Sequence, residues 1–224
     1  MTPVLWPCPL PDGGSAEEYA LTFDQGRDKR LLIVPALFDE ANRMRRFTVE
    51  VMRRLDGAGI DSFFPDLPGC NESLEPLETQ TPARWREAMR SAAAHFGATH
   101  VMGVRGGALL TPEDLPTWHY TPAKAASILR QLIRSRILTA REAGISESQE
   151  GLMETGLAEG LELSGFRLGA AFLREFQALT PPVGASEIAQ DTIGGGGLWL
   201  RAEPDEDRQQ ADALAAALAI GIKV

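Results

Sequence analysis

The chain has 224 residues, of which 44% are hydrophobic and 24% are charged, and its formal net charge is −9. This size and composition are typical of a globular protein with a substantial core, and they exclude a long disordered segment. The negative charge argues against binding to nucleic acid or to an anionic membrane surface. No apolar run reaches the roughly 18–20 residues of a membrane span, and the N-terminus lacks the features of a signal peptide, so we expect a cytoplasmic protein.

The first half of the chain alternates between strand and helix patterns. Two amphipathic segments predict helices, the first capped by Asp39 or Asn42 and the second starting at Thr81 with Pro82 behind it. Short connections join these helices to apolar segments, an arrangement that predicts a doubly wound, mostly parallel sheet. The segments that predict strands are residues 19–23, 31–34, 60–65 and 100–104.

After residue 110 the pattern is mainly helical. We interpret residues 111–180 as a helical cap insertion over a core formed by residues 1–110 and 181–224, the whole being one compact unit. The insertion is predicted to contain helix starts at Thr111-Pro112 and Thr121-Pro122, helices over 125–137 and 146–157, a hairpin over 161–168 and a helix ending near 179. The remainder is predicted to contain a flexible loop over 180–197, a strand at 198–200, a helix over 207–219 and an edge strand over 220–224.

The segment Gly103-Val104-Arg105-Gly106-Gly107 follows the last strand of the first half. Its spacing is that of the G-x-S-x-G nucleophile elbow, with arginine in the place of serine. Two further segments support this interpretation. Asp66–Ser73 (DLPGCNES) resembles a D-x-x-G-x-G-x-S loop, and Trp199–Asp205 (WLRAEPD) resembles the strand and turn that deliver a triad acid, which places Asp205 in the acid position. We therefore predict an α/β-hydrolase fold.

The histidine of a catalytic triad is missing from this pattern. The chain holds only His95, His100 and His119, and none follows the last predicted strand. His95 lies beside a helix stripe and His100 at a strand start, where both are expected to be structural. With arginine at the elbow and no terminal histidine, a serine mechanism lacks two of its three side chains.

Five blocks of the chain resemble the exosortase A system-associated hydrolase 2 family, a branch of the α/β-hydrolase superfamily. The resemblance implies that arginine at the elbow is a family habit, and it implies a setting of exopolysaccharide production and protein sorting in Gram-negative bacteria. A hydrolase name of this kind rests on the fold, and a fold does not establish chemistry. The blocks are PALFDEANRMRR at 35–46, DLPGCNES at 66–73, GVRGGALL at 103–110, Trp118 with ILRQLIRSR at 128–136, and ELSGFRL at 162–168.

Arg105 at the elbow has two interpretations. Its guanidinium could grip a carboxylate or phosphate beside a helix N-terminus. Alternatively it pairs internally with Asp39, Glu40 or Asp205, which is the interpretation we favour, with direct catalysis the least favoured. The side chains predicted to line a ligand cleft are those of Phe38, Asp39, Glu40, Asn42, Arg105, Gly106, Trp118 and His119, with Trp118 and His119 at its roof.

Three functions remain open at this stage. The first is non-hydrolytic binding of a small anionic, acyl or glycosyl ligand or of a protein partner, with no cofactor and no metal. The second is hydrolysis or acyl transfer with an unusual nucleophile, for which Cys70, Asp39 and Asp205 are the options. Cys70 follows Gly69 in a loop, and a lone loop cysteine is more often inert because reactivity requires an electropositive setting. The third is a structural subunit that dimerises through the arginine-bearing helix of the insertion.

Overall fold

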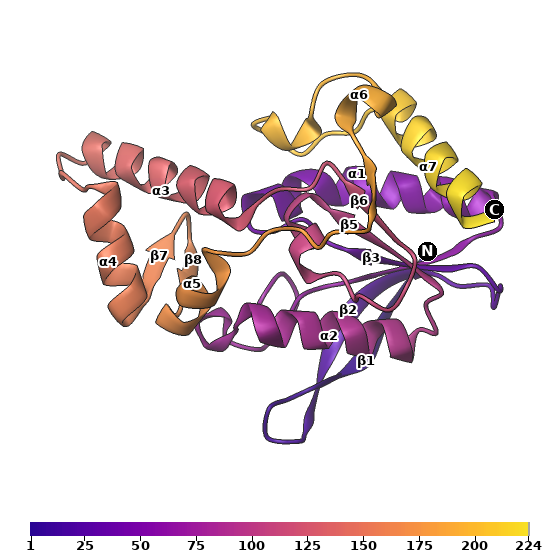
Figure 1. Cartoon of the computed structure of the whole chain (residues 1–224), viewed down its shortest axis with the longest axis horizontal. Helices are drawn as coiled ribbons and strands as arrows, with labels where there is room; N and C mark the ends of the chain where they lie inside the picture. The colour runs from indigo at the N-terminus through magenta and orange to yellow at the C-terminus, as the bar shows by residue number, and fades with distance from the viewer. Residues whose placement is uncertain (224) are drawn as a thin grey trace.

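A seven-stranded sheet forms the centre of the molecule in a computed structural model that describes residues 1–223 (Figure 1). The strand order is β1-β2-β4-β3-β5-β6-β9. The pairs β1–β2 and β2–β4 are antiparallel and the others are parallel, which confirms the predicted mostly parallel sheet. The strands are β1 (Thr2–Pro9), β2 (Ser15–Phe23), β3 (Arg30–Val34), β4 (Asp61–Pro65), β5 (His100–Val104), β6 (Thr117–Tyr120) and β9 (Ser186–Ile188).

The central parallel strands are buried on both faces. All five residues of β4 are buried, and so are the last four of β3 and of β5. Unbroken apolar runs such as Leu31–Val34 are therefore the expected pattern, because helices cover both sides of a parallel sheet. The segment β1, by contrast, was not predicted, since three prolines interrupt it. It lies at the edge of the sheet, where prolines are tolerated.

Helices form a layer on each face of the sheet (Figure 1). The helices α1 (Asp39–Gly57) and α7 (Arg208–Lys223) share one apolar cluster with the residues of β3 and β5 that face them. The helix α2 (Pro82–His95) covers the opposite face. Thr81 caps α2 as predicted, its side chain accepting from the Arg84 N–H. The cap of α1 differs from the prediction: neither Asp39 nor Asn42 serves, and the N-cap is Phe38 with a φ of 55°.

The chain between β6 and β9 is mainly helical. It contains α3 (Ala125–Glu142), α4 (Gln149–Glu159), the hairpin of β7 (Leu161–Leu163) and β8 (Phe166–Leu168), and α5 (Ala170–Phe176). The start of α3 lies over the sheet, while its far end and α4 extend away from it (Figure 1). Phe166, Phe172 and Phe176 join this part to the core, because their rings pack around Phe38 at centroid distances of 5.3–6.0 Å.

One strand of the sheet lies inside the predicted insertion. No helix starts at Thr111-Pro112, and residues 117–120 form β6, parallel to β5. The prediction failed because four residues with the sequence TWHY give too short an alternation to identify a strand. The helix predicted to start at Thr121-Pro122 begins only at Ala125.

The C-terminal quarter also differs from the prediction. The supposed loop at 180–197 contains β9 and the short helix α6 (Gln190–Ile193). Residues 198–200 form a 3₁₀ turn, η3 (Leu198–Leu200), and not a strand. A short apolar triplet next to four glycines does not distinguish these two structures. The predicted edge strand at 220–224 is wrong as far as residue 223, since α7 continues to Lys223, and Val224 lies outside the described residues.

The turn after β5 depends on a glycine that approaches the neighbouring strand. Residues 105–110 form a 3₁₀ helix, η2 (Arg105–Leu110), which begins at Arg105. A Cβ placed on Gly107 would lie 2.5 Å from the Val34 carbonyl oxygen and closer still to that of Pro35. Backbone atoms cannot move aside as a flexible side chain can, so this position has no room for a larger residue.

We predict that Gly107→Ala lowers the free energy of unfolding by about 3 kcal/mol, because overpacking against backbone displaces β3 from the elbow. Gly57→Ala is the matched control, since a Cβ on Gly57 meets no atom within 4 Å. Urea denaturation followed by circular dichroism measures both variants. Equal midpoints for the two would contradict the close approach.

Candidate functional site

Arg105 is held in a strained backbone conformation at the carboxyl end of β5. Its φ is 53°, a value that non-glycine residues adopt rarely and that elbows use to present a side chain. The neighbouring strands are β3, which ends before α1, and β6, which ends at Tyr120. The turn therefore resembles a nucleophile elbow in its backbone conformation and in its place after β5, with an arginine side chain.

The Arg105 guanidinium forms a bidentate ion pair with Glu40. Nε donates to one carboxylate oxygen of Glu40 at 3.1 Å and Nη2 to the other at 3.0 Å. Both side chains are largely buried, with 16% of the arginine and 8% of the glutamate exposed. This two-point geometry is the strongest form of carboxylate–arginine contact and fixes the plane of the guanidinium. Of the partners predicted for Arg105, the structure pairs it with Glu40.

Two other segments hold the same guanidinium. Nη1 donates to the Thr121 carbonyl oxygen at 2.7 Å, and the guanidinium carbon lies 4.1 Å from the centre of the Trp199 ring. Trp199 is itself tied to α1, because Arg43 donates to its carbonyl oxygen at 3.2 Å. The hydrogen bonds therefore occupy the guanidinium in its plane, and the Trp199 ring covers one of its faces.

Little space remains beside the first turn of α1. A void of only about 10 Å³ lies beside Phe38, Asp39 and Glu40, enough for roughly one water molecule. Ile128 of α3 and Leu37 pack closely here, since a Cβ on Gly106 would lie 2.8 Å from Ile128 and 2.9 Å from Leu37. This void is too small for an acyl or glycosyl group.

The residues predicted to line the cleft have separate surroundings. Phe38 is a core residue inside the aromatic cluster described above, and Gly106 is buried. Asn42 is exposed on α1, beside Arg45 and Arg46. Asp39 is partly exposed and lies 3.9 Å from Arg43. Only Glu40 and Arg105 of this set contact each other through their side chains.

Trp118 and His119 do not roof the cleft, because both belong to β6. Alternate residues of a strand point to opposite faces, so the two side chains separate. Trp118 packs toward α7, where a Cβ on Gly221 would meet its ring at 2.8 Å. His119 lies on the other face, 3% exposed, with its Nε2 3.2 Å from the Thr111 hydroxyl oxygen.

Asp205 is not delivered to the elbow by a strand. It lies in the loop between η3 and α7, where it pairs with Arg201 and accepts the Glu206 backbone N–H at 2.7 Å. That N–H and Arg201 lower the pKa of the carboxyl group. The strand after β6 in the sheet is β9, and the first residue of the helix that follows, Gln190, hydrogen-bonds to the Tyr120 hydroxyl at 2.7 Å. An amide cannot act as a triad acid.

Cys70 is not an activated nucleophile. Burial, together with the charges of Asp66 and Glu18, raises its pKa to about 12. The nearby Asp66 is occupied by Arg45 at 2.7 Å and by the Asn71 amide at 2.9 Å. A thiol in acidic, buried surroundings stays protonated and unreactive at neutral pH.

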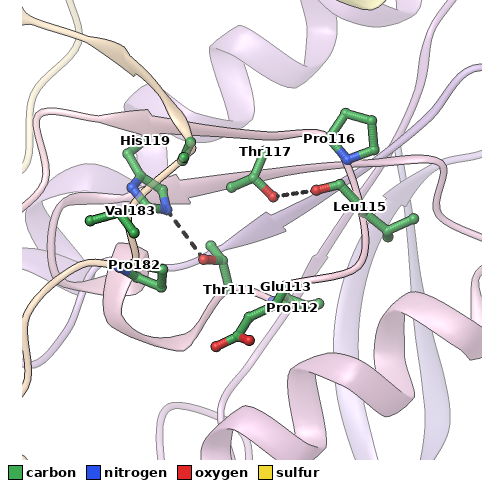
Figure 2. A pocket seen from close by; sticks show the side chains of 11 residues that line it. Thr111, Pro112, Glu113, Leu115, Pro116, Thr117, His119, Pro182 and Val183 are labelled. Carbon is green, nitrogen blue, oxygen red and sulfur yellow. Dashed lines mark hydrogen bonds between the residues drawn. The ribbon is translucent and has the colours of Figure 1, made fainter.

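A larger cavity that we did not predict lies near His119 (Figure 2). It has a volume of about 550 Å³ and lies between the loop that leads into β6 and the loop that leads into β9. These loops are at the amino ends of the parallel strands, whereas the elbow is at their carboxyl ends. The cavity and the elbow therefore lie at opposite ends of the strands. The sequence offered one sign of this cavity. Residues 111–116 are a short connection between η2 and β6, and they form no helix that would cover this face.

Neither a metal centre nor a membrane span is found in the part of the chain that the structure describes. Histidine, cysteine and carboxylate side chains of residues 1–223 form no cluster suited to a metal ion. No helix among these residues has both the length and the apolar character needed to cross a bilayer.

Together these features define an α/β-hydrolase fold in which an ion-paired arginine, Arg105, lies in the turn after β5. Solved structures of this fold are similar over nearly the whole chain. They include mouse alpha/beta hydrolase domain-containing protein 10 (TM-score 0.55, 16% identity, 92% of each chain covered) and Est1E from Butyrivibrio proteoclasticus with ferulic acid bound (0.53, 13%, 92% and 93%). A putative hydrolase from Agrobacterium vitis has a TM-score of 0.50, with 14% identity and 99% and 98% coverage.

At these identities the likeness establishes the fold alone. No model of a known protein family matches the chain, and no curated protein sequence matches it either. The resemblance to the exosortase-associated family therefore stays a prediction.

We predict that breaking the elbow ion pair destabilises the fold. Arg105→Met and Glu40→Gln should each lower the free energy of unfolding by about 3 kcal/mol, because each leaves a largely buried group unpaired. The double variant should lose less than the sum of the two, by about 1–3 kcal/mol. Chemical denaturation measures the cycle.

Arg90→Met is the control for the loss of an arginine. Arg90 pairs with Glu87 on the exposed face of α2, and such pairs contribute roughly 0–1 kcal/mol. Strict additivity of the Arg105 and Glu40 variants would show that the two groups do not interact.

Proposed function

We propose that the protein is a non-hydrolytic member of the α/β-hydrolase superfamily, whose role is binding and not bond cleavage. One observation carries the proposal: the side chain at the elbow is Arg105, and Glu40 holds it in a bidentate pair. A guanidinium has no lone pair available for attack at neutral pH and cannot take the role of serine. The small size of the void beside Glu40, about 10 Å³, also supports a non-hydrolytic role.

The histidines give no support to a general-base mechanism at the elbow. His100 lies at the amino end of β5, whereas Arg105 follows its carboxyl end, on the order of 13 Å along the strand. His95 is at the end of α2, where its ring packs on Phe96. His119 is in the middle of β6 and bonds to Thr111. A base must come within hydrogen-bond reach of the proton that it removes.

The competing proposal of an unusual nucleophile has weaker support. Cys70 has a pKa raised to about 12, and Asp205 lies in a surface loop with Arg201. Asp39 is partly exposed, and the cation it pairs with is Arg43.

The resemblance to the exosortase-associated family sets the proposed binding role in exopolysaccharide production.

We predict that the purified protein does not hydrolyse p-nitrophenyl acetate or butyrate above the rate of buffer. Arg105→Ser should be equally inactive, because it restores neither a base nor an open cleft. A spectrophotometric assay and labelling by a fluorophosphonate probe measure the two properties independently.

Turnover that disappears in Cys70→Ala, Asp39→Asn or Asp205→Ala would overturn the proposal and identify the nucleophile. Turnover that persists in all three variants would also overturn it, because the wild-type chain would then hydrolyse esters by another group. Trace contamination is excluded by measuring the rate across the fractions of a size-exclusion column, where activity must follow the protein.

A further inference from the structure

A buried carboxyl group lies beside the loop that follows β4. Glu18 belongs to β2, and only 1% of it is exposed. Next to it is loop 69–75, which lies between β4 and the 3₁₀ turn η1 (Leu77–Thr79). Buried carboxylates usually have a cation as partner. Glu18 forms no ion pair within residues 1–223, so its charge state affects the stability of the structure around it.

One hydrogen bond connects Glu18 to this loop. The Ser73 hydroxyl donates its proton to Glu18 Oε1 at 2.8 Å. The same hydroxyl oxygen accepts from the backbone N–H of Gly69 at 2.8 Å and from that of Glu75 at 3.2 Å. Ser73 therefore holds the turns of loop 69–75 together and attaches them to β2.

The second carboxyl oxygen of Glu18 has no partner. Oε2 is buried and accepts no hydrogen bond from the described residues. Trp6 lies opposite Glu18 in the pairing of β1 with β2, but its Nε1 is also unpartnered, and its ring packs beside His95 and Phe96 at the end of α2. A buried ionised carboxylate with an unsatisfied oxygen costs free energy, and protonation reduces that cost.

The charged groups that face this carboxyl group are mostly negative. Asp66, directly after β4, and Glu75 in the loop disfavour a further negative charge, and the facing cation is Arg84 of α2. Arg84 lies 3.9 Å from the Glu75 carboxylate, which offsets its charge. The thiols of Cys8 on β1 and Cys70 in the loop stay neutral at pH 7, because burial and the acidic surroundings raise the pKa of each to about 12.

The pKa of Glu18 differs between a closed and an open loop. Burial raises it above the ordinary 4.5 and outweighs the Ser73 hydrogen bond, which lowers it. In an open loop water solvates the carboxylate, and the pKa returns toward its ordinary value. The closed loop is therefore most stable at low pH, and it loses stability as the pH rises through the pKa of the buried Glu18.

Loop 69–75 is the segment around Glu18 that can open most easily. The chain before it is fixed, because Leu67 is buried and Trp85 donates to the Pro68 carbonyl oxygen at 2.9 Å. Residues 71–75 are exposed or half-buried, and 96% of Leu74 is exposed. Few apolar contacts hold such a segment, so it opens locally at a lower free energy than the strands beneath it.

We propose that the buried carboxyl group of Glu18 makes the opening of loop 69–75 depend on pH. At mildly acidic pH the neutral group stays beneath the loop and accepts the Ser73 hydroxyl proton. At higher pH the carboxylate has no cation and one unpartnered oxygen, and the open loop is favoured because water reaches it. No hydrogen bond or ion pair among the described residues joins Glu18 or Ser73 to Arg105, so the inference does not rest on the proposed function.

Hydrogen–deuterium exchange of the full chain between pH 5 and pH 8 tests this inference. The backbone N–H groups of Gly69, Ser73 and Glu75 report on the loop, since each donates a hydrogen bond when it is closed. After correction for the intrinsic pH dependence of exchange, their protection should fall at least threefold from pH 5 to pH 8. Protection that is the same at both values would overturn the inference.

Variants assign the effect to Glu18. Glu18→Gln keeps the size of the side chain without its charge, so its loop protection should not change with pH. Glu17→Gln, at the exposed neighbouring acid of β2, is the matched control and should keep the wild-type pH dependence. Ser73→Ala should lower the protection already at pH 5. A pH dependence that persists in Glu18→Gln would overturn the inference and point to another group, such as His95.

The titration of Glu18 itself provides a test that needs no variant to fold. Carbon-13 spectra of the side-chain carboxyl groups should give a midpoint for Glu18 above 4.5, matching the midpoint of the loss of protection. A midpoint at or below 4.5 would contradict the inference. Neither result changes the outcome of the ester-hydrolysis assay, so the two proposals can fail separately.

Discussion

The ion pair between Arg105 and Glu40 joins the segments on which the site depends. Through one guanidinium the elbow after β5 is connected to the first turn of α1, to Thr121 directly after β6 and to Trp199 before α7. These segments are far apart in the sequence, and their meeting sets how β3, β5 and β6 present their carboxyl ends. A buried pair contributes little net stability compared with apolar packing, but removal of one partner leaves a charge that nothing satisfies. The pair therefore fixes the positions of these segments more than it adds to the free energy of unfolding.

The strained turn after β5 and the pair between Arg105 and Glu40 belong to one arrangement. An elbow stores backbone strain in order to present a side chain, and here the φ of 53° at Arg105 presents a cation that the protein itself neutralises. Helix α3 packs Ile128 against Leu37 and Gly106 and leaves space for about one water molecule. A larger cavity lies at the amino ends of β6 and β9, where the short segment 111–116 leads into β6. A binding role at that cavity is compatible with a closed elbow.

The sequence predicted the parts of the structure that strong patterns determine. The aliphatic run at 31–34 forms β3, and the helix start at Thr81-Pro82 is confirmed. The glycine spacing around Arg105 is a weaker signal on its own, and the segment forms a turn after β5. Short elements were missed, because TWHY at 117–120 and LWL at 198–200 carry too few residues to set a period. The partner of Arg105 was undecided between Asp39, Glu40 and Asp205. Neighbouring residues of a helix point about 100° apart, so only the start of α1 determines whether Asp39 or Glu40 faces the elbow. The sequence also did not show that Asp205 pairs with Arg201 in a loop. The cavity was not predicted, because a helix was expected to start at Thr111-Pro112, where the structure has a short connection between η2 and β6.

The most direct test of the account is the behaviour of the Arg105 side chain in solution. A ¹H–¹⁵N spectrum of the arginine Nε–H groups, assigned by the signal lost in Arg105→Lys, measures how tightly the guanidinium is held. The account predicts a slowly exchanging Nε–H for Arg105 at neutral pH, shifted by the ring current of Trp199, which becomes fast-exchanging in Glu40→Gln. A wild-type signal that exchanges as fast as those of exposed arginines such as Arg90 would contradict it, because the elbow arginine would then be free to meet a ligand.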